Sequence, residues 1–170
     1  RVIINKRSIQ EEKSMNKILA DMHTHTIASG HAYATLTEMC KEAANKGLEI
    51  YGITEHSSGI PGTCADIYFQ NLRVVPRDLF GLDLRLGAEI NIIDYNGTLD
   101  FDQKYIDRLD FVIAGIHSVC YKFGSKEENT AAIINAIKNP NVNIISHPDD
   151  GRCPLDYEAL VQAAKEYHVL

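Results

Sequence analysis

Hydrophobic residues form short runs that alternate with amphipathic stretches along the chain. The runs predict five strands, at Ile18–Met22, Ile50–Thr54, Leu84–Ile90, Phe111–Gly115 and Val142–Ser146. Helical spacing of apolar residues separates most of them. Strands that alternate with helices are typical of a parallel sheet with right-handed crossovers, so the pattern predicts an α/β fold.

Local signals place the helices. Thr35 and Glu38 have the spacing of a capping box, and Gly47 lies where the helix after them would end. Apolar spacing predicts a helix over Thr130–Lys138 and another from Asp156 through Tyr167, with Leu160, Val161 and Ala164 on one face. Short helices are expected at Ile67–Arg77 and Asp102–Leu109, and Asn96-Gly97 is a turn signal.

The two ends of the chain differ from its middle. Residues 1–14 are polar and precede Met15, so we expect a disordered or appended leader there. Residues 15–170 are then one domain. An apolar run begins at the last residues, which suggests that the chain is the N-terminal part of a larger domain.

Composition narrows the functional class. The chain has 170 residues, 45% of them hydrophobic, which is enough for one globular domain with a core. Its net charge of −6 argues against a general nucleic-acid binder, and no run is long enough to span a membrane, so we expect a cytoplasmic protein. The four scattered cysteines fit reduced thiols. Cys120, near His117, is an accessory ligand or, as we favour, a buried or half-buried thiol.

Ligand-type side chains follow the predicted strands. His23, His25 and His31 come directly after the first strand, and each later strand is followed by or contains one further candidate: His56, Glu89, His117 and His147. Side chains two apart on a strand end point the same way, so His23 and His25 can face one ion. In parallel barrels the active site gathers at the carboxyl ends of the strands. Imidazole with carboxylate suits zinc, manganese or iron, so the sequence predicts a transition-metal site.

Six short motifs occur in order: Asp21-x-His-x-His25, Ala28-Ser-Gly-His-Ala-Tyr33, Thr54-Glu-His56, Gly87-Ala-Glu89, Ala114-Gly-Ile-His117 and Ser146-His-Pro148. Each alone is weak evidence. Together they resemble the PHP (polymerase and histidinol phosphatase) superfamily, most closely its YcdX-like metal-dependent phosphoesterases. The resemblance covers residues 17 to 170.

The resemblance implies a distorted, TIM-like (β/α)7 barrel with up to three divalent ions. It implies that His23 and His25 hold one ion, that Glu89 bridges it to a second ion held by His117 and His147, and that His31 and His56 hold the third. Asp21 would orient a ligand imidazole. The family's last motif, an Asp and a His on a late strand, is absent from these residues, as are the last strands.

The expected chemistry is hydrolysis of a phosphoric ester. Divalent ions would activate water and neutralise phosphoryl oxygens, with Glu89 and His117 acting through the metals. We expect a small phosphorylated substrate. A histidinol-phosphate phosphatase and a non-catalytic metal-binding module are the alternatives. No G-x-S-x-G nucleophile motif is present to favour a serine hydrolase.

Several other polar residues are weaker candidates. The side chains that could reach a substrate phosphate are Arg73, Arg77, Lys122 and Arg152. Glu55 is either an acceptor for a metal ligand or a loop carboxylate. An open barrel would leave an unpaired strand edge, which could promote a homo-oligomer.

Overall fold

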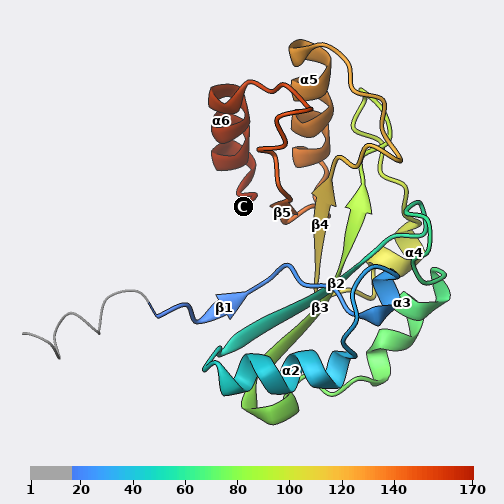
Figure 1. Ribbon diagram of the computed structural model, residues 1–170. Helices are drawn as coiled ribbons and strands as arrows, with labels where there is room; N and C mark the ends of the chain where they lie inside the picture. The colour runs from blue at the N-terminus through green and yellow to red at the C-terminus, as the bar shows by residue number, and fades with distance from the viewer. Residues whose placement is uncertain (1–16) are drawn as a thin grey trace, which may run out of the picture.

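Five parallel strands form one sheet in the order β1-β2-β3-β4-β5 in the computed structural model, which describes residues 17–170 (Figure 1). The strands are β1 (Ala20–Asp21), β2 (Ile50–His56), β3 (Asp83–Asn91), β4 (Phe111–Gly115) and β5 (Ile144–Ile145). The predicted parallel α/β fold is confirmed. The predicted leader, residues 1–14, lies outside the described residues.

Helices connect the strands. They are α2 (Leu36–Asn45), α3 (Ile67–Asn71), α4 (Gln103–Ile106), α5 (Lys126–Ile137) and α6 (Tyr157–Tyr167), with short 3-10 turns η2 (Ile27–Ser29), η3 (Leu72–Val74) and η4 (Leu79–Gly81). The capping box that starts α2 is present, and Asp156 caps α6 as predicted. Helices α5 and α6 lie side by side beyond β4 (Figure 1).

Several predicted element boundaries need correction. The first strand is shorter than expected and exposed, because only Ala20 and Asp21 pair with β2. Helix α5 begins at Lys126 instead of Thr130, since Ser125 and Glu128 form a second capping box. The fifth strand is also shorter than the expected Val142–Ser146, because only Ile144 and Ile145 pair with β4. On α6, Leu160, Val161 and Ala164 line one groove as predicted, with Val161 half exposed.

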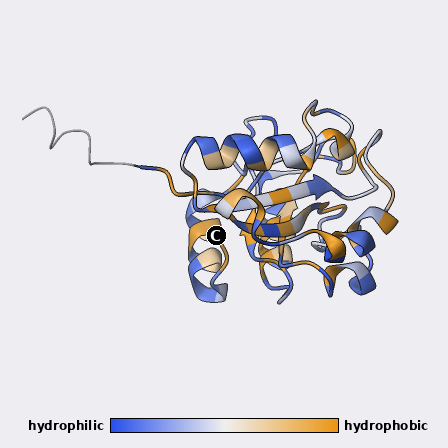
Figure 2. Ribbon diagram, turned by 90° about the horizontal axis from the view of Figure 1, so that it is seen from below, coloured by the Kyte–Doolittle hydropathy of each residue, from blue (hydrophilic) through white to orange (hydrophobic). Residues whose placement is uncertain are grey.

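The central strands are buried on both faces, as expected where helices cover a parallel sheet. Leu84, Leu86 and Ile90 of β3 are fully buried, and β4 is buried along its whole length. Hydrophilic and hydrophobic residues alternate around the surrounding helices (Figure 2). The core therefore fixes β3 firmly, and with it the polar residues at its carboxyl end.

Within residues 17–170, none of the helices combines the length and the apolar character that crossing a membrane would require.

Candidate metal centre

A single buried carboxylate, Glu89, lies among five imidazoles. Its Oε2 atom is 3.0–3.2 Å from a ring nitrogen of each of three histidines: His23, His25 and His56. Its Oε1 atom is 2.9 Å from His147 Nε2 and 3.3 Å from His117 Nε2. Glu89 has no exposed surface. The predicted ligands therefore meet at one point, although they are scattered over 125 positions of the chain.

Strand register explains this convergence. His56 is the last residue of β2 and is the direct cross-strand neighbour of Glu89 in β3, so both side chains leave the same face of the sheet. His117 lies two residues beyond Gly115, the last residue of β4, at a position that continues the same face. The carboxyl ends of parallel strands share one edge, and the site forms there.

His147 reaches the site through an unusual backbone conformation. Its φ of 28° lies in the left-handed region, which non-glycine residues seldom adopt. The preceding residue, Ser146, is buried with its hydroxyl toward Gly115. Simple alternation would turn the next side chain away from this face, so the positive φ is what brings the ring of His147 back to Glu89.

The nitrogen and oxygen atoms of the cluster are placed as metal ligands would be. Among residues 17–170, His56 Nδ1, His117 Nε2 and Glu89 Oε2 are buried atoms without a hydrogen-bond partner. The Nε2 atoms of His23 and His25 lie 3.2 Å apart. Such crowding of acceptor atoms is unfavourable unless a proton or cation lies between them. Two groups have ligand atoms that all lie within 4.8 Å of one another: His23, His25 and Glu89, and His56, Glu89 and His117.

His31 occupies the rim of this cluster. Its ring centroid is 4.9 Å from that of His56 and 5.3 Å from that of His25. His56, which was expected to pair with His31 at a separate ion, also lies beside Glu89. The predicted residues are thus brought together, with His56 shared between the rim and the centre.

Burial and hydrogen bonding set the protonation of the cluster. Burial raises the pKa of the Glu89 carboxyl, but the close contacts with His117, His147 and the other rings outweigh burial and hold the pKa well below its ordinary range. Burial lowers the pKa of His56 to about 3. The hydrogen bond to Glu89 raises the pKa of His147. A neutral His56 beside an ionised Glu89 is the state in which both can bind a cation.

Buried polar residues hold two of the rings from behind. His25 Nδ1 is 3.0 Å from Ser29 Oγ, whose hydroxyl donates to the fully buried Glu55. His117 Nδ1 is 2.7 Å from Asn91 Oδ1. Glu55 is therefore an acceptor behind a candidate ligand, which decides between its two predicted roles. Ser29 and Asn91 were missed from the sequence, although Asn91 lies two residues after Glu89 on the same face of β3.

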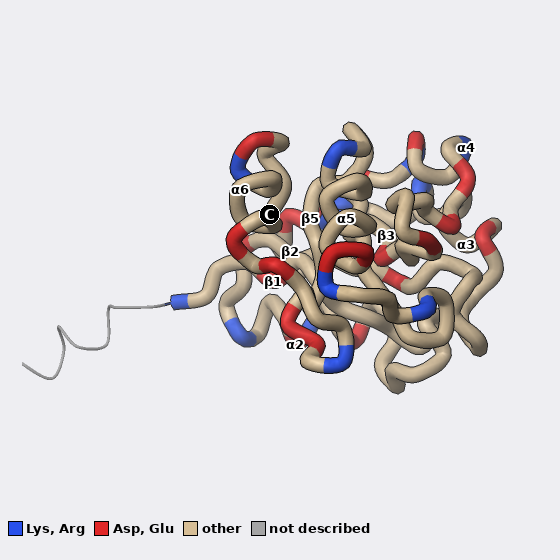
Figure 3. The backbone as a smooth tube through the Cα atoms, turned by 90° about the horizontal axis from the view of Figure 1, so that it is seen from above, with Lys and Arg blue, Asp and Glu red and all other residues tan. Residues whose placement is uncertain are grey.

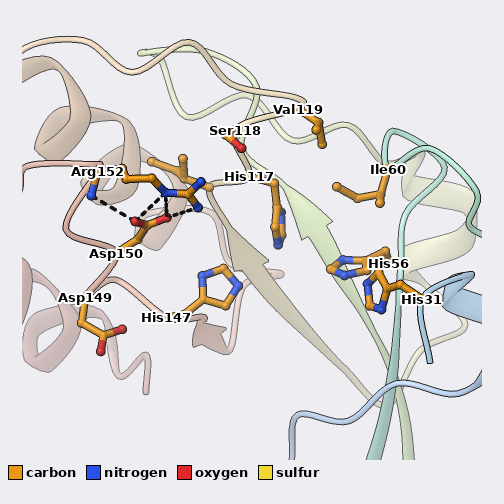
Figure 4. Close-up of a pocket in the computed structure, with 11 residues that line it drawn as sticks. His31, His56, Ile60, His117, Ser118, Val119, His147, Asp149, Asp150 and Arg152 are labelled. Carbon is orange, nitrogen blue, oxygen red and sulfur yellow. Dashed lines mark hydrogen bonds and ion pairs between the residues drawn. The ribbon is translucent and has the colours of Figure 1, made fainter. Parts of the chain in front are cut away.

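A cavity of about 460 Å³ opens over the cluster (Figure 4). Four histidines line it together with an apolar wall that includes Ile60 and Val119. On the opposite side Arg152 extends over the cavity, and its guanidinium donates to both carboxylate oxygens of Asp150 at 2.7–3.2 Å. This ion pair keeps the pKa of Asp150 low, at about 2.

The remaining candidates lie elsewhere. The carbonyl of Arg77 accepts from the backbone N–H of Leu84, which lies five residues before Glu89 on β3. Five residues of strand span roughly 16 Å, so Arg77 lies far from the cluster, and its side chain binds Asp110. Arg73 and Lys122 are exposed and do not line the cavity. Asp21 accepts from the backbone N–H of His23, which differs from the ring contact expected of it.

Cys120 is a half-buried free thiol, the alternative that we favoured over a metal ligand. Its Sγ donates to the carbonyl of Gly59 at 3.2 Å, and burial raises its pKa. All four cysteines are free.

Relatives of the chain include named phosphatases. It is 49% identical over 150 residues to a "Probable phosphatase" of Acetivibrio thermocellus, covering 88% of this chain and 62% of that protein. It is 50% identical over 148 residues to a "Probable phosphatase" of Caldicellulosiruptor saccharolyticus, covering 87% and 62%. The chain thus spans less than two thirds of the length of these relatives.

A solved structure shares the fold. It is a histidinol phosphate phosphatase from Lactococcus lactis subsp. lactis, complexed with zinc, L-histidinol and phosphate. The TM-score is 0.57 at 20% sequence identity, over 88% of this chain and 70% of that one. The model of the PHP domain family matches residues 21–168, which include all six motifs and every histidine of the cluster. The chain belongs to the PHP domain family.

Proposed function

We propose that this chain carries the metal centre of a phosphoric ester hydrolase that acts on a small phosphorylated molecule. The observation that carries the proposal is the buried Glu89 carboxylate shared by five imidazoles beneath an open cavity. The names of its relatives support a phosphatase. A (β/α)7 barrel remains our prediction for the fold as a whole, and the five parallel strands of the described residues are consistent with it.

The ligand groups suggest how ions would be held. His23, His25 and Glu89 would hold one, and Glu89, His56 and His117 a second. His147, which lies beside Glu89 Oε1, would add a further imidazole ligand. His31 and His56 are the candidate ligands of a third ion. Divalent zinc, manganese or iron bound there would supply charge for activating water and for neutralising a phosphoryl group.

The chain's own residues would bind the substrate. Arg152 is the basic side chain that lines the cavity, and its planar fork can bind phosphate in place of Asp150. The apolar wall at Ile60 and Val119 would receive the organic part of the substrate. Elsewhere basic and acidic residues are interspersed over the described chain (Figure 3), so anion binding would depend on this local arrangement.

Two alternatives to a general phosphoric ester hydrolase can each be tested. A histidinol-phosphate phosphatase would hydrolyse that substrate much faster than other monoesters, and the shared fold with such an enzyme is the observation in its favour. A non-catalytic module would bind metal without turnover.

The direct test combines metal content with hydrolysis. The chain, purified without chelator, is analysed for transition metals and assayed on a chromogenic phosphate monoester with zinc, manganese or iron(II) added. We expect at least two ions per chain and turnover that a chelator abolishes. Metal binding without turnover on any of a panel of small phosphate monoesters would refute the hydrolase and support the non-catalytic module. The absence of bound metal would refute the ligand set itself.

A further inference from the structure

An amide and a carboxylate stand behind His117, outside the candidate ligand groups. Asn91 has no exposed surface, and its Oδ1 lies 2.7 Å from His117 Nδ1. Its Nδ2 is 2.5 Å from Asp100 Oδ2 and 2.9 Å from Ser57 Oγ. Asp100 also accepts from the Asn91 backbone N–H at 2.8 Å and from the Ser57 hydroxyl at 2.7 Å. The network joins the residue after β2, the last residue of β3 and the segment after β3.

Hydrogen-bond polarity along this network permits one arrangement. A carboxylate only accepts, so the Asn91 atom that faces Asp100 must be the NH₂ group, which leaves the amide oxygen facing His117. An amide oxygen also only accepts, so His117 Nδ1 must carry the proton. The lone pair of the neutral ring is then on Nε2, the atom 3.3 Å from Glu89 Oε1 that has no hydrogen-bond partner among residues 17–170.

The surrounding chain is shaped to this network. A Cβ at Gly59 would lie 2.2 Å from Asp100 Oδ2 and 2.9 Å from Asn91 Nδ2, so only glycine lets the 57–60 loop lie this close. The same polarity recurs at His25, where the Ser29 hydroxyl donates to Glu55 and can therefore only accept from His25 Nδ1. Two rings thus have a buried neutral group behind them and a carboxylate one step further away.

We propose that Asp100 is a positioning residue: through Asn91 it fixes His117 as the Nδ1–H tautomer and so keeps Nε2 free to bind a metal. The inference rests on the proposed function in one respect, that His117 is a ligand. It goes beyond it by assigning a role to a side chain that belongs to neither candidate ligand group and does not line the cavity. Partners of this kind typically change metal affinity by 10- to 100-fold.

The substitution Asp100→Asn tests this without changing side-chain size. The new amide keeps its oxygen on the Asn91 backbone N–H, so its NH₂ group faces the NH₂ of Asn91. Two donors cannot pair, and Asn91 should turn over and present its NH₂ to His117 Nδ1. That nitrogen must then accept, and the proton moves to Nε2. We expect about 10- to 100-fold weaker zinc binding.

The reciprocal variant provides a rescue. Asn91→Asp combined with Asp100→Asn exchanges amide and carboxylate, so the carboxylate accepts from both the new amide and His117 Nδ1–H. This double variant should regain the wild-type tautomer. Asp94→Asn is the matched control, because Asp94 is a half-buried carboxylate on the same segment that accepts from the backbone N–H groups of Asn96 and Thr98.

The measurements are zinc affinity by competition with a chelating dye and long-range ¹H–¹⁵N correlation of the histidine rings in the zinc-loaded chain. We expect a His117 signal with Nδ1–H and zinc on Nε2 in wild type, Asp94→Asn and the double variant, and its loss in Asp100→Asn. If Asp100→Asn keeps this signal and binds zinc like Asp94→Asn, the positioning role is refuted while the proposed function stands. If the wild-type chain binds no zinc, the ligand set fails, and this inference fails with it.

Discussion

Replacing Glu89 with glutamine tests whether one carboxylate serves both ligand groups. Glutamine has nearly the same shape, but it presents one oxygen and one NH₂ group where Glu89 presents two oxygens. Oε2 faces His23, His25 and His56, and Oε1 faces His117 and His147. Whichever way the amide turns, one side of the cluster meets a nitrogen that cannot bind a cation.

The size of the effect follows from that geometry. Both candidate groups include Glu89, so Glu89→Gln removes the negative charge from each and a ligand atom from at least one. We expect the metal content to fall by at least one ion per chain. A metal ion supplies several kcal/mol of transition-state stabilisation. A loss of about 4 kcal/mol corresponds to roughly 10³-fold in kcat/KM.

The assay pairs elemental analysis with hydrolysis of a phosphate monoester, and circular dichroism confirms the fold. Glu49→Gln is the matched control, since the Glu49 side chain is 65% exposed and its ion pair with Lys17 is 3.9 Å long. That variant should keep wild-type metal content and activity. Full metal loading and turnover in Glu89→Gln would show that the carboxylate does not bridge the groups, and the arrangement proposed for the ions would be wrong.

Three smaller predictions follow from the same geometry. Gly115→Ala would place a Cβ 2.1 Å from Ser146 Oγ and 3.2 Å from Glu89 Oε1. It should lower the metal content and reduce the free energy of unfolding, measured with denaturant, by about 1–3 kcal/mol. Gly151→Ala is the control and should change neither, because a Cβ there would meet nothing within 4 Å. Arg152→Ala should raise KM for a phosphate monoester several-fold and leave metal content unchanged; an unchanged KM would remove Arg152 from the substrate site. The metal-free chain should lose stability as pH falls from 6.5 toward 3, because folded His56, with its pKa near 3, binds fewer protons than the unfolded chain does, and thermal unfolding in chelator across that range measures this.

The sequence was most informative where chemistry and periodicity coincided. Parallel strands put their carboxyl ends at one edge, so a histidine or glutamate at each strand end had to converge, and His56 beside Glu89 is the direct result. The capping box of α2 is a local signal and was read correctly. The same signal at Ser125 and Glu128 went unread, which is why α5 was expected to begin four residues late.

Other features depend on tertiary structure alone. Ser29 and Asn91 are small polar residues whose roles require knowing which ring nitrogen they face. The turn of His147 into the site depends on one positive φ that no local sequence pattern marks. Arg77 has the right chemistry for phosphate but lies near the amino end of β3, and only the strand register reveals that distance.

The arrangement of carboxylates explains how an acidic chain can bind an anion. Glu89 is the single carboxylate in the two candidate ligand groups, and the other ligands are imidazoles, which bind metal as neutral groups. Divalent ions held this way would keep most of their positive charge for a phosphoryl group. Glu55 and Asp100 orient two of the imidazoles, but Ser29 and Asn91 stand between these carboxylates and the rings. The Glu55 and Asp100 carboxylates thus orient the imidazoles of His25 and His117 through neutral side chains. Their negative charge therefore lies one hydrogen bond further from the place where the phosphate would bind.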